Sequence, residues 1–110
     1  MTTLRTVLTT AVLAAEALQT EAPVVLVDFW APWCAPCRAL TPALEALAGE
    51  RDDMKHVKVN TDEEQSLAAS YGVMGLPTVV ILRDGRQVGT ITQAAPKRRL
   101  AAQIDAAIAV

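Results

Sequence analysis

The chain has 110 residues, a common length for one domain, and we expect residues 1–110 to form a single domain. Hydrophobic residues make up 52% of it and charged residues 20%, a composition typical of a globular protein and not of a disordered one. Ten basic and twelve acidic side chains give a net charge of −2. This balance gives no electrostatic reason to expect nucleic acid or an anionic membrane as a partner.

The first residues bear a weak similarity to a secretory signal, with Arg5, an apolar stretch and the Ala15-Glu16-Ala17 triplet. Threonines interrupt the stretch, however, and one arginine makes a poor basic region. No other segment approaches the ~18 uninterrupted apolar residues that would span a bilayer. We therefore expect a cytoplasmic protein without a membrane partner, in which a stable structural disulfide would be unusual.

In chain order, residues 6–9 could form a short strand and residues 11–19, rich in alanine, a first helix. Pro23 then breaks the chain before "VVLVDFWA" at residues 24–31. This run is apolar and β-branched without polar alternation, which predicts a central strand covered on both faces.

Residues 34–51 predict a helix whose apolar positions recur at three- and four-residue steps. These positions form one buried stripe: Cys37, Leu40, Leu44 and Leu47. Pro36 fits the first turn, where its missing N–H costs nothing, whereas Pro42 is expected to kink the helix further on.

Further along, "HVKVN" at residues 56–60 predicts a strand and residues 62–70 a helix with acidic residues in its first turn. The runs "TVVIL" and "QVGTIT" predict two strands, and the Asp-Gly pair between them is a hairpin signal. Pro96 opens a last helix, whose cap is weak because Ala95 offers no side-chain acceptor. The order predicts an α/β fold of three layers, a mixed and mainly five-stranded sheet flanked by about four helices.

The two cysteines of the chain, Cys34 and Cys37, form a C-x-x-C pair. A structural zinc site needs four ligands, and the chain holds one other thiol or imidazole ligand, His56, which lies in a predicted strand. A complete metal or iron–sulfur site within the chain is therefore not expected. Zinc shared between two copies remains an alternative.

A redox role fits the spacing better. Residues three apart in a helix lie within one turn, at a separation that a disulfide can bridge. Cys34 would lie at the helix N-terminus, where unpaired N–H groups favour the thiolate, and we expect it to be the exposed nucleophile. Cys37 lies one turn further on the buried stripe and is expected to be the resolving thiol. The alternative, a small buried hydrophobe, explains Cys37 alone.

Asp28 is a carboxylate within the apolar strand 24–31. Burial disfavours its charged form, so it could hold or release a proton near neutral pH when Cys37 must be deprotonated. The alternative is that Asp28 points outward at the strand end. Lys58 is a candidate neighbour, although a strand lysine that extends into solvent fits equally well.

The segment "GVMGLPT" places Pro77 directly before a predicted strand. A cis Leu76–Pro77 bond and an ordinary trans proline at a strand start are both consistent with the residues. Beside Cys34, the backbone groups of Leu76 could pair with an extended substrate.

Taken in order, "VDFWAPWCAPC", "VNTDE", "YGVMGLPT" and the hairpin "DG" resemble the thioredoxin family over essentially the whole chain. The resemblance implies a thioredoxin fold and a general protein-disulfide reductase with a redox disulfide Cys34–Cys37. It makes Cys34 the nucleophile and Cys37 the resolving thiol. Asp28 becomes the buried proton acceptor with Lys58 near it, and Pro77 becomes a cis-proline that faces the disulfide.

The resemblance also implies a substrate-docking surface that contains Trp33, Pro36, Met74, Gly75, Leu76 and Pro77. Gln93 stands where the family commonly has a glycine, and its larger side chain could reshape substrate access. Ala35 replaces the usual glycine between the cysteines, so we expect an effect on redox potential and partner preference.

Family members are recharged by thioredoxin reductase, a flavin protein that uses NADPH, so the resemblance implies no bound cofactor in this chain. The implied partners are that reductase and disulfide-containing target proteins, and the implied state is a monomer. Two alternatives remain: a thiol oxidase or isomerase of the same fold, and a redox-independent protein-binding module.

Overall fold

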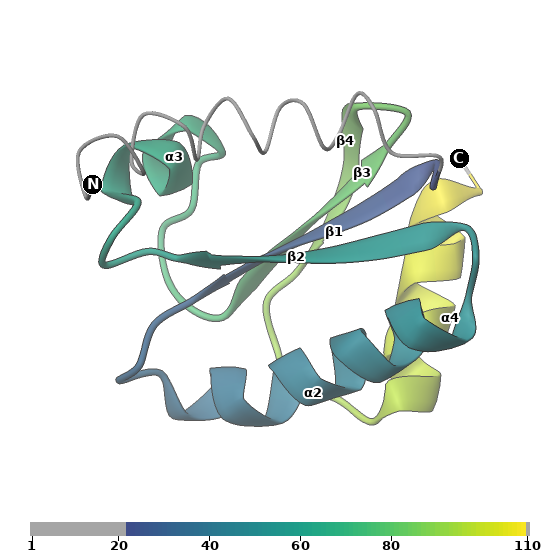
Figure 1. The fold of residues 1–110 in the computed structure, drawn as a ribbon, viewed down its shortest axis with the longest axis horizontal. Coiled ribbons are helices and arrows are strands. Elements are labelled where there is room, and N and C mark those ends of the chain that lie inside the picture. The colour runs from purple at the N-terminus through teal and green to yellow at the C-terminus, as the bar shows by residue number, and fades with distance from the viewer. Residues whose placement is uncertain (1–21, 110) are drawn as a thin grey trace.

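The computed structural model describes residues 22–109, which contain four strands and three helices (Figure 1). The sequence predicts a mainly five-stranded sheet with about four helices. The strand predicted at 6–9 and the helix predicted at 11–19 lie outside the described residues. The other predicted elements, four strands and three helices, are those that the structure shows.

The strands are β1 (Val24–Trp30), β2 (Met54–Asn60), β3 (Thr78–Arg83) and β4 (Arg86–Ile91), arranged in the order β2-β1-β3-β4. β1 pairs parallel with β2 and antiparallel with β3, and β3 pairs antiparallel with β4. The predicted mixed sheet is confirmed for these strands.

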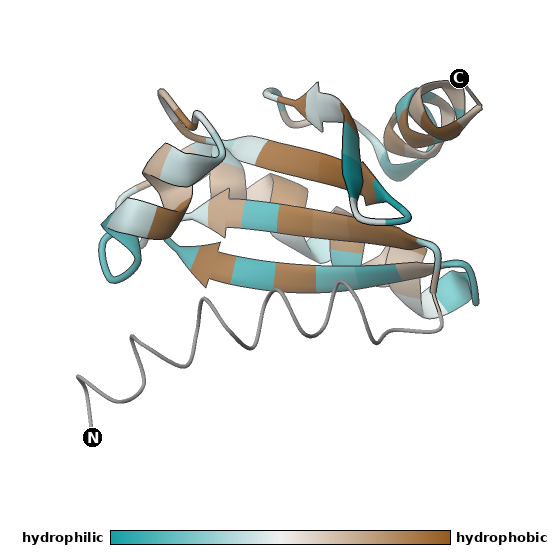
Figure 2. Ribbon diagram, turned by 90° about the horizontal axis from the view of Figure 1, so that it is seen from above, coloured by the Kyte–Doolittle hydropathy of each residue, from teal (hydrophilic) through white to brown (hydrophobic). Residues whose placement is uncertain are grey.

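β1 is a central strand, and its first six residues are buried. Because successive side chains of a strand point to opposite faces, Val24 and Leu26 enter one apolar cluster while Val25, Val27 and Phe29 enter the other. Figure 2 shows hydrophobic colouring along most of the two central strands, β1 and β3. The apolar run without polar alternation therefore marks a strand with both faces covered, as predicted.

The helices α2 (Ala35–Glu50) and α4 (Lys97–Ile108) cover one face of the sheet, and α3 (Gln65–Ser70) covers the other (Figure 1). The stripe predicted on α2 is buried as expected: Cys37, Leu40, Leu44 and Leu47. These helices give the three layers. α2 runs through Pro42 as one helix to its end.

Two elements begin two or more residues away from the predicted position, and the bounds of the other described elements agree with the prediction to within one residue. α3 begins at Gln65, because Asn60 first organises a turn. Its side-chain Oδ1 accepts from the N–H of Asp62, and its carbonyl oxygen accepts from the N–H groups of Glu63 and Glu64. The acidic residues therefore precede the helix. β2 begins two residues earlier than predicted, at Met54, which is buried and pairs with the first residue of β1.

The hairpin between β3 and β4 turns at Asp84 and Gly85, with φ values of 51° and 83°. Two successive positive φ values are what a two-residue turn between twisted strands requires, and an Asp-Gly pair tolerates them. The hairpin prediction is confirmed. Pro96 precedes α4 without a side-chain cap, also as predicted. Among the residues that the structure describes, no helix is long and apolar enough to cross a membrane.

Candidate active site

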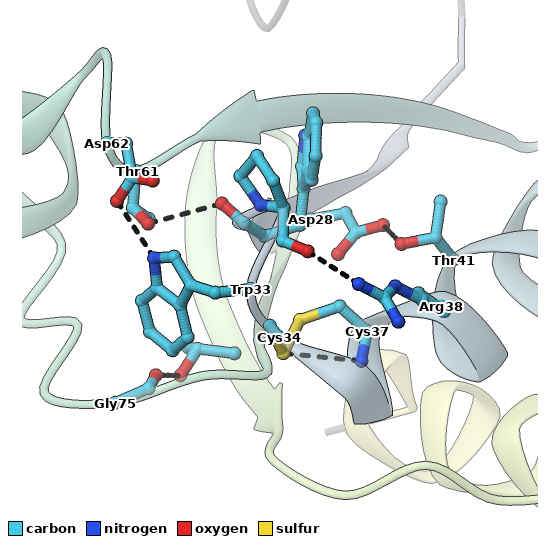
Figure 3. Close-up of a disulfide and its surroundings, with 12 residues drawn as sticks. Asp28, Trp33, Cys34, Cys37, Arg38, Thr41, Thr61, Asp62 and Gly75 are labelled. Atoms are coloured by element: carbon cyan, nitrogen blue, oxygen red, sulfur yellow. Dashed lines mark hydrogen bonds between the residues drawn. A yellow bond between two sulfur atoms is a disulfide. The ribbon is translucent and has the colours of Figure 1, made fainter.

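Cys34 and Cys37 are joined by a disulfide at the start of α2, with 2.19 Å between the sulfur atoms and 5.4 Å between the Cα atoms (Figure 3). Cys34 is the N-cap residue of the helix, and its Sγ accepts from the N–H of Cys37 at 3.3 Å. The pairing is the one that the resemblance implied, and Cys34 lies at the helix N-terminus, as expected.

The two cysteines do not differ in exposure, contrary to the sequence-based expectation that Cys34 is exposed and Cys37 shielded. Their exposed fractions are 4% and 3%. The disulfide joins the two sulfur atoms, and the Cys34 N–H donates to the carbonyl oxygen of Ala31 in the turn that precedes α2. In this oxidised state the exposed neighbour is Trp33, at 66%.

The loop between β1 and α2 is held by side-chain hydrogen bonds on both sides. Nε1–H of Trp33 donates to Oδ1 of Asp62 at 3.1 Å. The guanidinium of Arg38 donates to the carbonyl oxygen of Pro32 at 2.9 Å. Figure 3 shows both bonds, with the indole between Asp62 and the segment that carries Gly75. The loop therefore has fixed contacts to α2 and to the turn after β2.

Asp28 is fully buried, which excludes the alternative that it points into solvent. Its Oδ2 accepts from Oγ1 of Thr41 at 2.7 Å and lies 2.9 Å from Nε2 of His56. Its Oδ1 has no hydrogen-bond partner among the described residues. Figure 3 shows the carboxyl group reaching from β1 toward Thr41 on α2. Both contacts are therefore made by Oδ2, and a proton could be added at Oδ1 without displacing either of them.

Lys58 is the Cα partner of Asp28 in the β1–β2 register, so it lies near Asp28 along the sheet, as expected. Its ammonium, however, lies 3.5 Å from Oε1 of Glu45, and the side chain is half exposed. The β2 side chain that contacts Asp28 is instead His56.

Sequence reasoning did not identify His56 or Thr41 as neighbours of Asp28. The signals were present but weak. Strand alternation places His56 on the same face of β2 as Lys58, and Thr41 lies four residues after Cys37, on the same side of α2. An open pocket lies beside the disulfide. It is lined by Cys37 and Thr41 of α2, by Lys58 of β2, and by Trp30, Ala31, Pro32, Arg38, Pro42 and Glu45.

The Leu76–Pro77 peptide bond is cis, which decides between the two conformations that the sequence left open. A shallow groove is lined by Gly75, Leu76 and Pro77, and by Met74, which is 98% exposed. Gln93 does not line this groove, and it belongs to a neighbouring pocket with Thr90 and Thr92 at the border. Pro36 and Ala35 are exposed in the first turn of α2.

Within residues 22–109, no group of three or more His, Cys, Asp or Glu side chains is arranged to hold a metal ion.

A helix-capping cysteine bridged to a second cysteine one turn later, with a buried carboxyl group nearby, is the chemistry of a disulfide oxidoreductase. The thioredoxin family model matches residues 6–106. Thioredoxin 1 of Synechococcus elongatus is 48% identical over 91 residues, which are 82% of this chain and 84% of that protein. Chloroplastic thioredoxin M-type of Chlamydomonas reinhardtii is 43% identical over 89 residues, 80% of this chain and 63% of that protein.

Among solved structures, Fasciola hepatica thioredoxin is similar with a TM-score of 0.78 and 34% identity, covering 88% of this chain and 92% of that one. The chain belongs to the thioredoxin family. It is a disulfide oxidoreductase, of a family that needs no bound cofactor.

Proposed function

We propose that the protein is a general protein-disulfide reductase that works by dithiol–disulfide exchange through Cys34 and Cys37. The observation that carries the proposal is the disulfide at the N-cap of α2, in whose surroundings the buried carboxyl group of Asp28 lies (Figure 3). The similarity to thioredoxins over most of the chain supports it.

In the first step, the reduced protein uses Cys34 as the nucleophile. A thiolate at the N-cap is stabilised by the unpaired N–H groups of the first helical turn, among them the N–H of Cys37. The thiolate attacks one sulfur atom of the target disulfide. A bond forms between Cys34 and the target, and the target's second sulfur leaves as a thiolate with the electron pair of the broken bond.

In the second step, Cys37 resolves the mixed disulfide. Asp28 accepts the proton of the Cys37 thiol, and the resulting thiolate attacks Sγ of Cys34. The Cys34–target bond breaks, and the target sulfur leaves as a thiolate that takes a proton from water. The protein is left oxidised, with the disulfide that the structure shows. Lys58 contributes positive charge at the rim of the pocket that Cys37 lines.

Targets dock on the surface formed by Trp33, Pro36 and the groove from Met74 to Pro77. The exposed indole and thioether offer apolar area that a partner can cover, and the backbone of Leu76 can pair with an extended segment of the target. Gln93 lines the neighbouring pocket and would limit targets that extend beyond Thr92.

Thioredoxin reductase recharges the protein in this proposal, so NADPH and a flavin act through the reductase and not in this chain. The protein works as a monomer of one domain, which is consistent with a family match over residues 6–106. We place it in the cytoplasm, a reducing compartment in which the cysteine pair is returned to the dithiol.

The mechanism is tested by trapping the intermediate. With insulin as the disulfide substrate, Cys37→Ser accumulates a covalent mixed disulfide because the resolving thiol is absent, whereas Cys34→Ser forms none. The adducts are measured by mass spectrometry without reductant. Reduction of insulin by both variants at the parent rate would contradict the mechanism.

The direction of exchange is tested separately. Equilibration of the Cys34–Cys37 pair against a series of glutathione buffers gives its potential. A reducing potential supports a reductase and an oxidising one supports a thiol oxidase or isomerase. Partner binding that survives replacement of both cysteines would support a redox-independent binding module.

A further inference from the structure

The carboxyl group of Asp28 is held asymmetrically. Two donors from different elements converge on Oδ2: Oγ1 of Thr41 from α2 at 2.7 Å and Nε2 of His56 from β2 at 2.9 Å. Oδ1 is buried and has no partner among the residues that the structure describes. His56 is itself buried, with 6% of its side chain exposed.

This asymmetry determines where a proton can be added. A protonated carboxyl group carries its hydrogen on one oxygen, and the other oxygen remains an acceptor. A proton on Oδ1 leaves both hydrogen bonds to Oδ2 intact, whereas a proton on Oδ2 would displace one of them. Oδ1 is therefore the atom of Asp28 that can accept a proton without loss of a hydrogen bond.

His56 adds a second titratable group in direct contact with the first. Imidazole is the side chain whose charge changes between about pH 5 and 8. Neutral His56 donates one hydrogen bond from Nε2 to the carboxylate, and protonated His56 adds a positive charge at the same 2.9 Å distance. That charge stabilises the carboxylate and makes it a weaker base.

Resting on the proposed function, we propose that His56 is a positioning residue which, by its charge, sets how readily Oδ1 of Asp28 accepts the proton of Cys37. The proton moves from Sγ of Cys37 to Oδ1, and the S–S bond to Cys34 forms as the Cys34–target bond breaks. No further oxidant or reductant takes part, because the target supplies the disulfide and the cysteine pair supplies the electrons.

Other charged groups surround the pair and must be considered in any pH effect. α2 contributes Arg38 and Glu45 beside Cys37, and β2 contributes Lys58. Glu45 and Lys58 are paired with each other at 3.5 Å, and β3 places the apolar Val79 opposite Asp28. His56 is the imidazole among them, and it touches the carboxyl group.

The test measures the Cys37 step alone. Reduced protein is mixed with Ellman's reagent in a stopped-flow instrument from pH 5 to 9. The first release of thionitrobenzoate reports attack by Cys34, and the second reports attack by Cys37 on the mixed disulfide. In the parent we expect the rate of the second release to fall about tenfold as the pH is lowered, in a single step of the rate–pH profile, because a positive charge beside the carboxylate makes it a weaker base.

The midpoint of this step must coincide with the charge transition of His56. His56 is the one histidine of the chain, so its ring protons can be followed directly by NMR in the parent protein. A rate profile without a step at that midpoint overturns the proposal, and this comparison needs no variant.

Two variants sharpen the test. His56→Gln keeps an N–H donor but does not titrate, so the step should disappear. Thr41→Val removes the other donor to Oδ2 and should retain the step, because His56 still titrates. A profile of His56→Gln that superimposes on that of the parent overturns the proposal. A cooperative thermal unfolding transition confirms that each variant is folded.

Asp28→Asn separates this proposal from the proposed function. If the second release is slow in Asp28→Asn but the His56→Gln profile equals that of the parent, Asp28 accepts the proton and His56 has no part. If Asp28→Asn releases the second thiol at the parent rate, the proton-acceptor role of Asp28 is wrong and the role of His56 fails with it.

Discussion

Asp28 is fully buried, and within residues 22–109 only one oxygen of its carboxyl group has a hydrogen-bond partner. Burying a charge without full compensation costs free energy, because the surrounding apolar strands solvate it poorly. Such sites commonly retain an unfavourable group because the chemistry needs it. The carboxyl group is therefore expected to lower the stability of the protein, whereas the proposed function gives it a role in the Cys37 step.

Replacement of Asp28 by Asn should raise the free energy of unfolding by about 1 kcal/mol at pH 8, because it removes a buried charge and retains an acceptor for Thr41 and His56. Urea unfolding of the oxidised protein measures the change. The exposed Asp52 provides the control, and Asp52→Asn should change stability by no more than about 0.5 kcal/mol. A clear loss of stability in Asp28→Asn would show that the ionised carboxyl group supports the fold.

At this scale the sequence predicts some properties of the site and not others. The C-x-x-C spacing predicts the disulfide, and a lone acid in an apolar strand predicts a buried Asp28. The contact with His56 depends on the register of β1 against β2, which joins residues 28 positions apart and is not encoded in a local pattern. The exposure predicted for Cys34 is wrong in this oxidised form, in which Cys34 is bonded to the buried Cys37 and is itself buried.

At the scale of elements, two glycines occupy opposite situations. Gly49 lies in the last turn of α2, and a Cβ there would meet no atom within 4 Å. Gly89 lies in β4, and a Cβ there would lie 3.0 Å from Cβ of Ala107 on α4 and 3.5 Å from Cδ1 of Ile81. Gly49 lowers the stability of α2 relative to alanine, whereas Gly89 allows α4 to approach the sheet closely.

Gly49→Ala should therefore raise the free energy of unfolding by about 0.5–1 kcal/mol, since alanine loses less conformational freedom in a helix. Gly89→Ala should lower it by about 1–2 kcal/mol, because the added methyl group overpacks the contact with Ala107. Denaturant unfolding of the two variants and the parent gives both values. Equal effects of the same sign would show that the packing of α4 on β4 does not distinguish these positions.

Element types were predictable where the local pattern is strong, as in β1, α2 and the Asp84-Gly85 hairpin. The start of α3 was not, because acidic residues favour a first helical turn in general, whereas here Asn60 binds the backbone of the residues that follow it. The side-chain oxygen of Asn60 accepts one of these N–H groups and its carbonyl oxygen accepts two, so the acidic residues form a turn before the helix.

At the scale of the whole molecule, Arg51 connects parts that are far apart in the sequence. From the C-cap of α2, its guanidinium contacts Asp53 at 2.7 Å, just before β2, and Asp105 on α4 at 2.8 Å. Hydrogen bonds from Arg51 hold the pKa of the Asp53 carboxyl group below its ordinary value, and both aspartates raise the pKa of Arg51. This network fixes the end of one helix against the other.

Arg51→Gln should lower the free energy of unfolding at pH 7 by about 0.5–1 kcal/mol, the range for partly exposed ion pairs. The folded-state pKa of Asp53 is lowered, so its contribution is complete above the unfolded value of about 3.9 and is lost as pH falls through the folded value. The difference between variant and parent should therefore shrink below about pH 4. Unfolding curves at pH 7 and pH 3 test this, with Arg98→Gln on the exposed face of α4 as the control. A constant difference at both pH values would contradict the assignment.

The overall architecture, like the element types, was predictable from the sequence only in part. A buried strand, a crossover helix and a terminal hairpin predict a mixed sheet in layers, and the structure confirms this for residues 22–109. Which side chains meet between the layers depends on registers set by many weak contacts at once. The contacts of Arg51 with Asp105 and of Asp28 with His56 both depend on such registers.

Met74 holds a third sulfur atom on the face that carries the disulfide's docking groove, with 98% of its side chain in solvent. A thioether exposed in this way oxidises to a sulfoxide, which is polar and which dithiol exchange does not reduce. Oxidative stress would thus have two effects on this protein. Oxidation of the cysteine pair to the disulfide is reversed by dithiol exchange, whereas the Met74 sulfoxide lasts until a separate repair enzyme reduces it. A molecule oxidised at Met74 would keep the reducing capacity of its cysteine pair but would lose part of the apolar surface that we propose for target docking.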